Sequence, residues 1–586
     1  MNIKKKGIQT VQITGLLFVA CSLLFSVSAC SDFLEIEPKE IIVQGKFWNE
    51  EADVENVVAG CYASMQSQAV IDRMMAWGEF RSDNIVGGTN IESNLDLSNI
   101  FKENINGSNA FAKWGEFYNI INKCNLVLRY APEVAGKDPN YSASELSTTQ
   151  AEVTALRALM YFYLIRSFRD VPYITEAYVS DNQEMTIAAT PFNEVLNSLI
   201  EDLEAVKDKA QRHYPSSKTY YQRGRITQEA IHAMLAEMYL WKQDYASAAR
   251  YADMVIASKT EEYTKQLSKQ TGVISSADQL IDGFPLTSDV FRTGNYYGNA
   301  YSTIFGSGNS EESIFELIYM NDDQMPANSS VSYRYGNSET FPGDVRPADF
   351  LCTDVNDEVF SVFKNKYDAR YYENLQPING SKTLSGISKY AFSSAMVDLS
   401  KATIQASYSG SYAKDLCHAN WIIYRLSDVM LMKAEALVEM AGNNENQNEN
   451  EKALADSLLN EAFKIVNAVS KRSNCSSSDK DLVREDYSTK ALMQELVLEE
   501  RQRELMFEGK RWYDLVRRAR RDGNTNYLVG VVSRKGDSGG GALSSKLARM
   551  DALYWPYHND ELKVNNKLKQ NPAFGSGENG SIERTK

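Results

Sequence analysis

Two stretches of the chain combine aromatic side chains with Asn, Asp and Arg, outside any helical repeat of apolar residues. The candidate ligand-binding residues are Trp77, Arg81, Asp83 and Asn84 in the first stretch, and Asn295, Tyr296, Tyr297 and Tyr301 in the second. Sugars present C–H groups on their faces and hydroxyls on their edges, so they need rings that stack and polar side chains that hydrogen bond. We expect at least one of the two stretches to contact ligand, although a single aromatic residue more often packs beneath a loop.

Three glutamates near the C-terminus, Glu499, Glu500 and Glu504, raise the alternative of glycoside hydrolysis, which uses a pair of carboxyl groups. Two of them continue a stripe of apolar residues at helical spacing, which includes Leu496 and Val497. Charged groups on a buried stripe must be paired. The sequence therefore favours a buried, ion-paired helical corner over catalysis.

The expected partners of these carboxylates lie within the same stretch. They are Arg501, Arg503 and Arg511. A glycine in a helix interior costs roughly 1 kcal/mol relative to alanine, so Gly509 predicts a bend or break there. Trp512 and Leu515 then begin a new apolar face.

Two further motifs resemble sites but lack the rest of the required chemistry. Gly536-Asp537-Ser538-Gly539-Gly540 matches the nucleophile loop of trypsin-like proteases, but it follows predicted helices and lies in a Gly/Ser-rich loop. Asn321-Asp322-Asp323 offers calcium ligands without the order of an EF-hand and is typical of a turn. We predict no enzyme activity and no cofactor, with calcium as the one candidate ion.

Composition narrows the classes of partner. The chain has 586 residues, a formal net charge of −15 and a pI of about 5.1, which disfavours nucleic acid. Aromatic residues make up 11%, and 33 of them are tyrosines. The seven cysteines show no CxxC or Cys/His ligand spacing and only four histidines occur, so we expect buried thiols and no metal site.

The N-terminus has the features of a secretory leader. Lys4 to Lys6 are followed by the apolar run 16–25, which is short for a membrane span. Val27-Ser28-Ala29-Cys30 then resembles a bacterial lipobox, so we predict a signal peptide over 1–29 and acylation of Cys30. Several acyl chains would anchor the mature protein stably to a membrane.

The elements that must position these residues are mostly helices. Helical spacing of apolar residues predicts helices at 52–66, 111–130, 150–168 and 192–210, with a long irregular excursion at 74–109 between the first two. The segment 225–258 fits a tetratricopeptide repeat, and 421–440 with 450–469 forms a comparable pair. Between them, about 259–419, the sequence is rich in Gly, Ser, Asn, Asp and Tyr, with short strand-like runs such as 313–319.

Several motifs together resemble the SusD/RagB family of outer-membrane nutrient-binding lipoproteins. The strongest is E-x-R-x-x-E-[LM]-x-F-E-G-x-R-W-x-D-L, from Glu499 to Leu515. A second covers Ala155 to Pro172, and weaker matches extend the resemblance from Cys30 nearly to Phe574. The resemblance implies one SusD-like fold, mostly α, in which helical repeats at 30–258 and 420–586 support an irregular, ligand-facing lobe at 259–419.

The same resemblance implies a function. A lipid-anchored protein on the outer face of the outer membrane would capture oligosaccharides and pass them to a TonB-dependent transporter, without catalysis. The alternatives are a peptide-binding lid of the RagB type, a secreted glycan hydrolase, and a repeat protein that binds only other proteins.

Overall fold

The computed structural model describes residues 47–575, apart from 181, 270–279, 292–295, 321–326, 337–342, 353–361, 364–366, 377–385, 399–403, 412–416, 443–447, 475–481 and 536–539. Cys30, the Asn321–Asp323 turn and most of the Gly536–Gly540 motif therefore lie outside the described residues. Within the described part, no helix combines the length and apolar character needed to cross a membrane.

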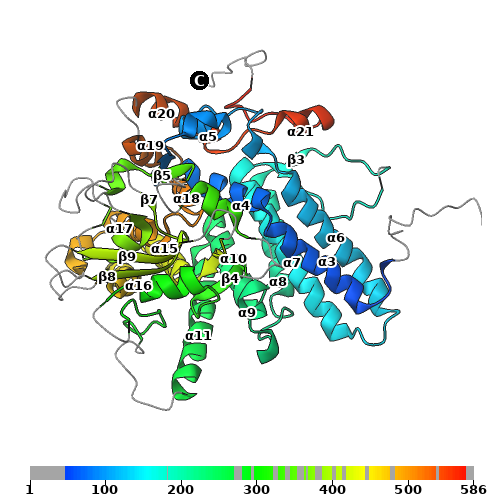
Figure 1. The fold of residues 1–586 in the computed structure, drawn as a ribbon, viewed down its shortest axis with the longest axis horizontal. Coiled ribbons are helices and arrows are strands. Elements are labelled where there is room, and N and C mark those ends of the chain that lie inside the picture. The colour runs from blue at the N-terminus through cyan, green and yellow to red at the C-terminus, as the bar shows by residue number, and fades with distance from the viewer. Residues whose placement is uncertain are drawn as a thin grey trace, which may run out of the picture.

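Long helices packed in succession form the framework (Figure 1). They are α3 (Glu51–Met65), α6 (Gly115–Ala135), α7 (Ala143–Phe168), α8 (Phe192–Val206), α10 (Gln228–Lys242), α11 (Tyr245–Lys269), α15 (Leu426–Met440), α16 (Glu449–Ser473) and α17 (Lys490–Leu505). Each of α3, α6, α7 and α8 packs on the next, and α10, α11, α15 and α16 do the same. Because α11 packs directly on α15, the lobe between them in sequence is an insertion into a continuous helical array. The predicted mostly-α fold is confirmed.

Local sequence explains why the helices begin and end where they do. Ser142 caps α7 by accepting a hydrogen bond from the N–H of Glu145, whose side chain bonds back to the cap. Between α10 and α11 the chain turns at Gln243, which has a left-handed conformation (φ +63°). Asp244 Oδ1 then accepts from the N–H of Ser247 (3.1 Å) at the start of α11.

Shorter helices fill the ends and the inserted lobe. They are α4 (Gln68–Met75), α5 (Leu95–Phe101), α9 (Tyr221–Gly224), α12 (Asn299–Tyr301), α13 (Ser329–Arg334), α14 (Arg370–Asn374), α18 (Arg511–Asp522), α19 (Asn526–Val532), α20 (Gly540–Leu547) and α21 (Asn559–Val564). The excursion predicted over 74–109 is more ordered than expected, since it contains the π-helical turn Ala76–Phe80 and α5.

Strands in the described part form two-stranded antiparallel pairs. The pairs are β1 (Ile85–Gly87) with β5 (Val345–Pro347), β2 (Val171–Pro172) with β3 (Ala189–Thr190), β4 (Ser313–Leu317) with β10 (Trp421–Arg425), β6 (Leu375–Gln376) with β7 (Gly386–Ile387), and β8 (Phe392–Asp398) with β9 (Gln405–Ser411). Every residue of β4 and β10 is buried, so this pair joins the inserted lobe to the helical core.

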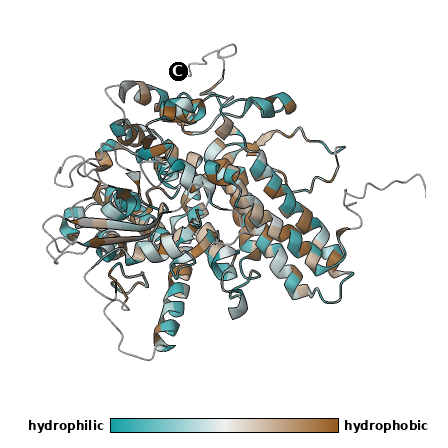
Figure 2. Ribbon diagram, viewed as in Figure 1, coloured by the Kyte–Doolittle hydropathy of each residue, from teal (hydrophilic) through white to brown (hydrophobic). Residues whose placement is uncertain are grey.

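The apolar residues collect between the helices, as the brown inward faces in Figure 2 show. One large core runs from Trp48 to Leu568, and a smaller one lies around α15, α16 and α17. Cys61, Cys124 and Cys417 are buried thiols, as predicted, whereas Cys352 is half-buried.

Candidate functional site

The first predicted sugar-binding stretch lies inside the protein. The Trp77 side chain is fully buried, its indole N–H donates to the carbonyl of Phe111 (2.8 Å), and its ring contacts Phe117 and Phe168. Arg81 is also buried and forms an ion pair with Glu103 (2.7 Å). These two side chains hold the π-helical turn in the core and have no surface to offer a ligand.

The remaining two residues of that stretch are buried as well. Asp83 forms an ion pair with Arg511 (2.8 Å), which opposes the effect of burial and leaves the pKa of Asp83 below its ordinary value. The amide of Asn84 donates to Glu79 (2.8 Å), and Gln502 donates to the Asn84 side chain (2.8 Å). The prediction that Trp77, Arg81, Asp83 and Asn84 contact ligand is thus corrected by their burial. Asp83 and Asn84 join the chain near residue 80 to Gln502 and Arg511 of the helical corner.

The second stretch is divided between surface and interior. The Tyr296 side chain is 40% exposed, whereas Tyr301 is buried and donates from its hydroxyl to the carbonyls of Ser388 (2.7 Å) and Phe392 (2.9 Å). Tyr297 is half-buried and packs against the core. Asn295 lies outside the described residues. Tyr301 is therefore a structural residue, and Tyr296 is the most exposed of the three tyrosines.

The backbone around Tyr296 is fixed by the strand beside it. Tyr297 and Val397 of β8 exchange two backbone hydrogen bonds (2.9 and 2.8 Å). Gly298 has a φ of +108°, and a Cβ atom there would lie 2.1 Å from the carbonyl oxygen of Ala395, so only glycine allows this approach. The Tyr296 ring is therefore presented on a defined backbone next to β8.

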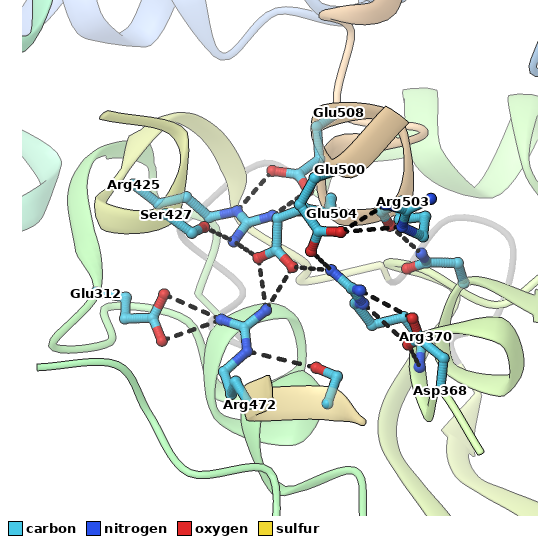
Figure 3. A network of polar contacts seen from close by, with 12 residues as sticks. Glu312, Asp368, Arg370, Arg425, Ser427, Arg472, Glu500, Arg503, Glu504 and Glu508 are labelled. Atoms are coloured by element: carbon cyan, nitrogen blue, oxygen red, sulfur yellow. Dashed lines mark hydrogen bonds and ion pairs between the residues drawn. The ribbon is translucent and has the colours of Figure 1, made fainter. Parts of the chain in front are cut away.

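Glu500, Glu504 and Glu508 of the C-terminal stretch lie in a buried ionic corner (Figure 3). Glu504 contacts three guanidinium groups, those of Arg370 (3.0 Å), Arg425 (2.5 Å) and Arg472 (2.5 Å). Burial acts to raise the pKa of Glu504, but the three cations outweigh it and hold the pKa well below the ordinary value. Glu504 thus stays ionised and cannot serve as a proton donor in glycoside hydrolysis.

The neighbouring charges are satisfied in the same way. Glu500 pairs with Arg503 (2.9 Å), as predicted, and with Arg370 (2.7 Å). Glu508 pairs with Arg425 (2.7 Å) and Lys389 (2.8 Å).

Two of the three predicted arginine partners bind other carboxylates. Arg501 contacts Asp514 (2.9 Å) and Asp428 (3.0 Å), and Arg511 contacts Asp83. The actual partners of Glu504 lie at the start of α14, the end of β10 and the last turn of α16. The sequence offers one indication that Arg425 is buried and needs a carboxylate partner, because it directly follows the apolar run Trp421–Tyr424. In the structure that whole run is buried.

The predicted bend at Gly509 is confirmed. Helix α17 ends at Leu505 and α18 begins at Arg511, with Gly509 in a left-handed conformation (φ +72°) between them. A Cβ atom on Gly509 would lie 3.0 Å from the carbonyl oxygen of Met74, so the corner packs closely on α4. Glu79 accepts backbone hydrogen bonds from Phe507 (3.1 Å) and Lys510 (3.2 Å) across the same junction.

Comparison with known proteins identifies the fold and the family. Two family models match, one described as the SusD family over residues 289–574 and one described as starch-binding associating with outer membrane over residues 32–240. SusD-like protein P38 of Formosa agariphila is 24% identical over 585 residues, covering 97% of this chain and 100% of that protein. SusD-like protein P2 of the same organism is 25% identical, covering 84% and 89%.

Solved structures show the same fold. A SusD superfamily protein from Bacteroides vulgatus superposes with a TM-score of 0.63 at 19% identity, covering 90% of this chain and 100% of that one. A laminarin-binding SusD-like protein superposes with a TM-score of 0.58 at 20% identity, with the same coverage. The family matches together span most of the sequence, and the fold agrees with them. The chain belongs to the SusD family.

Proposed function

We propose that this protein captures oligosaccharides at the cell surface and delivers them, uncleaved, to a TonB-dependent outer-membrane transporter. The observation that carries the proposal is family membership, which includes a match over residues 32–240 to a model described as starch-binding and associating with the outer membrane. The superposition on a laminarin-binding SusD-like protein supports the same class of ligand. Acylation of Cys30 would tether the protein to the outer membrane, facing outward.

The proposed contact surface is the segment of the inserted lobe around Tyr296. Its exposed ring can stack on the C–H face of a sugar, and the bridge between Tyr297 and Val397 fixes the backbone that carries it. Asn295 would supply an amide for sugar hydroxyls. Helical repeats at 30–258 and 420–586 would support this lobe, which extends over 259–419.

The proposal also states that the protein does not hydrolyse its ligand. Glu500 and Glu504 are buried and ion-paired, and Glu499 lies against Arg503 (3.6 Å). Hydrolysis would require one carboxyl group to give up a proton to the leaving oxygen, which a carboxylate held by three guanidinium groups does not do. This geometry supports binding over hydrolysis at the signature stretch.

Affinity electrophoresis in gels containing laminarin, starch or other polysaccharides tests the proposal. We expect retardation without release of reducing ends. Tyr296→Ala should weaken retardation by about 2- to 12-fold, the equivalent of roughly 0.5–1.5 kcal/mol for one stacked ring. Tyr220→Ala is the matched control, because Tyr220 is 51% exposed but lies in the helical part before α9.

Each other outcome has a definite meaning. Release of reducing ends by the purified chain would contradict the non-catalytic proposal. Binding of peptides with no retardation by any glycan would replace it with the peptide-binding alternative. Equal effects of the two tyrosine variants would remove Tyr296 from the site. Co-purification with a TonB-dependent transporter from the native membrane tests the delivery step.

A further inference from the structure

A cavity of about 320 Å³ lies between the beginning of α6 and the C-terminal helix α21 (red in Figure 1). The segment that follows α7 closes its third side. The apolar part of its wall consists of Trp114, Tyr118, Ile121, Pro172, Ile174 and Leu568. At the edge, the side chains of Met185 and Val564 are 56% and 71% exposed. The cavity is remote in sequence from Tyr296, and the proposed function does not use it.

The amide side chains that line the cavity already form hydrogen bonds with backbone groups of the protein. Asn122 donates to the carbonyl of Tyr178 (3.1 Å) and accepts from its N–H (2.8 Å). Asn125 donates to the carbonyl of Glu176 (3.1 Å), and Asn565 donates to that of Ile187 (2.7 Å). These bonds brace the loop after α7. They leave few groups for a ligand with many hydroxyls, so a sugar does not suit this cavity.

Two other polar groups on the wall have no such hydrogen bonds. Among the residues that the structure describes, neither the indole N–H of Trp114 nor the carboxylate of Glu561 makes a hydrogen bond or ion pair. Glu561 is half-buried, and the rings of Trp114 and Tyr118 lie edge to face with centroids 5.6 Å apart. A carboxylate beside aromatic rings favours a positively charged group, both by charge-assisted hydrogen bonding and by cation–π attraction.

We propose that this cavity is a binding site for a small amine with an aromatic or branched aliphatic body. The apolar body would occupy the space between Ile121, Pro172 and Leu568, and the ammonium group would lie at the edge near Glu561. The volume is at the lower end of the roughly 300–1,000 Å³ typical of small-molecule sites. A ligand with one ring and a short chain fits that size.

The test uses the purified full chain and three probes of similar shape. They are phenethylamine, 2-phenylethanol and 3-phenylpropanoate, which are cationic, neutral and anionic at pH 7. Saturable binding is measured by calorimetry or ligand-observed NMR. We expect phenethylamine to bind most tightly and 3-phenylpropanoate most weakly.

Two substitutions locate the site. Gly115 lines the cavity and a Cβ atom there would meet nothing within 4 Å, so Gly115→Leu fills the cavity without a backbone clash. We expect it to weaken phenethylamine binding at least about 10-fold. Gly60→Leu is the matched control, because Gly60 is also a helical glycine with nothing within 4 Å of its Cβ position, but it lies in α3 away from the cavity. Glu561→Gln should weaken phenethylamine about threefold and leave 2-phenylethanol unchanged.

The proposal is overturned if phenethylamine shows no saturable binding, or if Gly115→Leu binds it as well as Gly60→Leu does. Equal affinity for all three probes would also overturn it, since the carboxylate would then have no part in recognition. If Gly115→Leu does not fold, the comparison of Glu561→Gln with the unmodified chain decides, because that carboxylate makes no hydrogen bond or ion pair with any described residue.

Discussion

Replacing Glu504 by glutamine perturbs the centre of the buried ionic corner. The cations of this corner are Arg370, Lys389, Arg425, Arg472 and Arg503, and its carboxylates are Glu312, Asp368, Glu500, Glu504 and Glu508. Five positive charges thus face five negative ones, all in side chains that are buried. Glu504→Gln keeps the size of the side chain but leaves one positive charge uncompensated inside the protein.

The loss of stability depends on which carboxylates each of the three guanidinium groups still contacts. Arg370 still contacts Asp368 (2.8 Å) and Arg425 still contacts Glu508, while Arg472 keeps Glu312 (3.3 Å). We therefore expect the loss of one buried ion pair, about 3–5 kcal/mol, instead of three times that amount. A chain of this length has an unfolding entropy of roughly 1 kcal mol⁻¹ K⁻¹, so the melting temperature should fall by about 3–5 °C.

The assay is thermal unfolding at pH 7.5, with Glu499→Gln as the control. Glu499 lies on the same helix, but its side chain is 37% exposed and its partner Arg503 is 3.6 Å away. An exposed pair of this kind contributes about 0–1 kcal/mol, so the control should lower the melting temperature by about 1 °C or less. Equal melting temperatures for the two variants would refute the reasoning, because burial would then make no difference to the value of the charge.

The same variant predicts a pH dependence. The pKa of Glu504 is lower in the folded protein than its ordinary value of 4.5, so its stabilisation is complete above that value and is lost as the pH falls towards the folded pKa. The difference in stability between the unmodified protein and Glu504→Gln should therefore narrow on going from about pH 5 to about pH 3. A difference that widened on acidification would contradict the assigned charge state.

Two further substitutions test the bend at Gly509 and the buried Trp77. Gly509→Ala should destabilise the protein more than Gly523→Ala does. Both glycines have left-handed φ values (+72° and +67°), which cost about 1–2 kcal/mol for alanine, but a Cβ atom at Gly523 would meet nothing within 4 Å. Equal shifts in melting temperature would mean that the close approach to Met74 does not matter. Trp77→Phe should lose about 1–3 kcal/mol of stability, because the hydrogen bond to Phe111 and part of the ring volume are removed, yet glycan retardation should be unchanged. Weaker retardation by a folded Trp77→Phe would restore Trp77 as a ligand contact.

The helical framework could be predicted from the sequence because its signals are local. Apolar residues repeat every three to four positions through α7, and small residues at that spacing let α10 and α11 pack closely. The ends of the helices are harder to predict from the sequence. α11 extends to Lys269, past the predicted end at Ser258, because its exposed last turns carry no apolar repeat. The bend at Gly509 was also predictable, since glycine tolerates the left-handed conformation that the turn needs.

Burial of the first aromatic stretch could not be predicted in the same way. Trp77, Arg81 and Asp83 have the residue types of a sugar site, and those types also suit a buried hydrogen-bonded network. The two cases differ only in whether other parts of the protein cover these side chains. Here residues hundreds of positions away in sequence cover them, such as Arg511 and Leu553.

The sequence by itself determined the helices, their buried faces, the bend at Gly509 and the need to pair Glu500 and Glu504. Periodicity and conformational preference act between residues a few positions apart, so the sequence carries them directly. Only the tertiary structure decided which cations meet Glu504, because Arg370, Arg425 and Arg472 lie 134, 79 and 32 positions away. Coulomb attraction depends on distance in space, and folding alone brings these charges together.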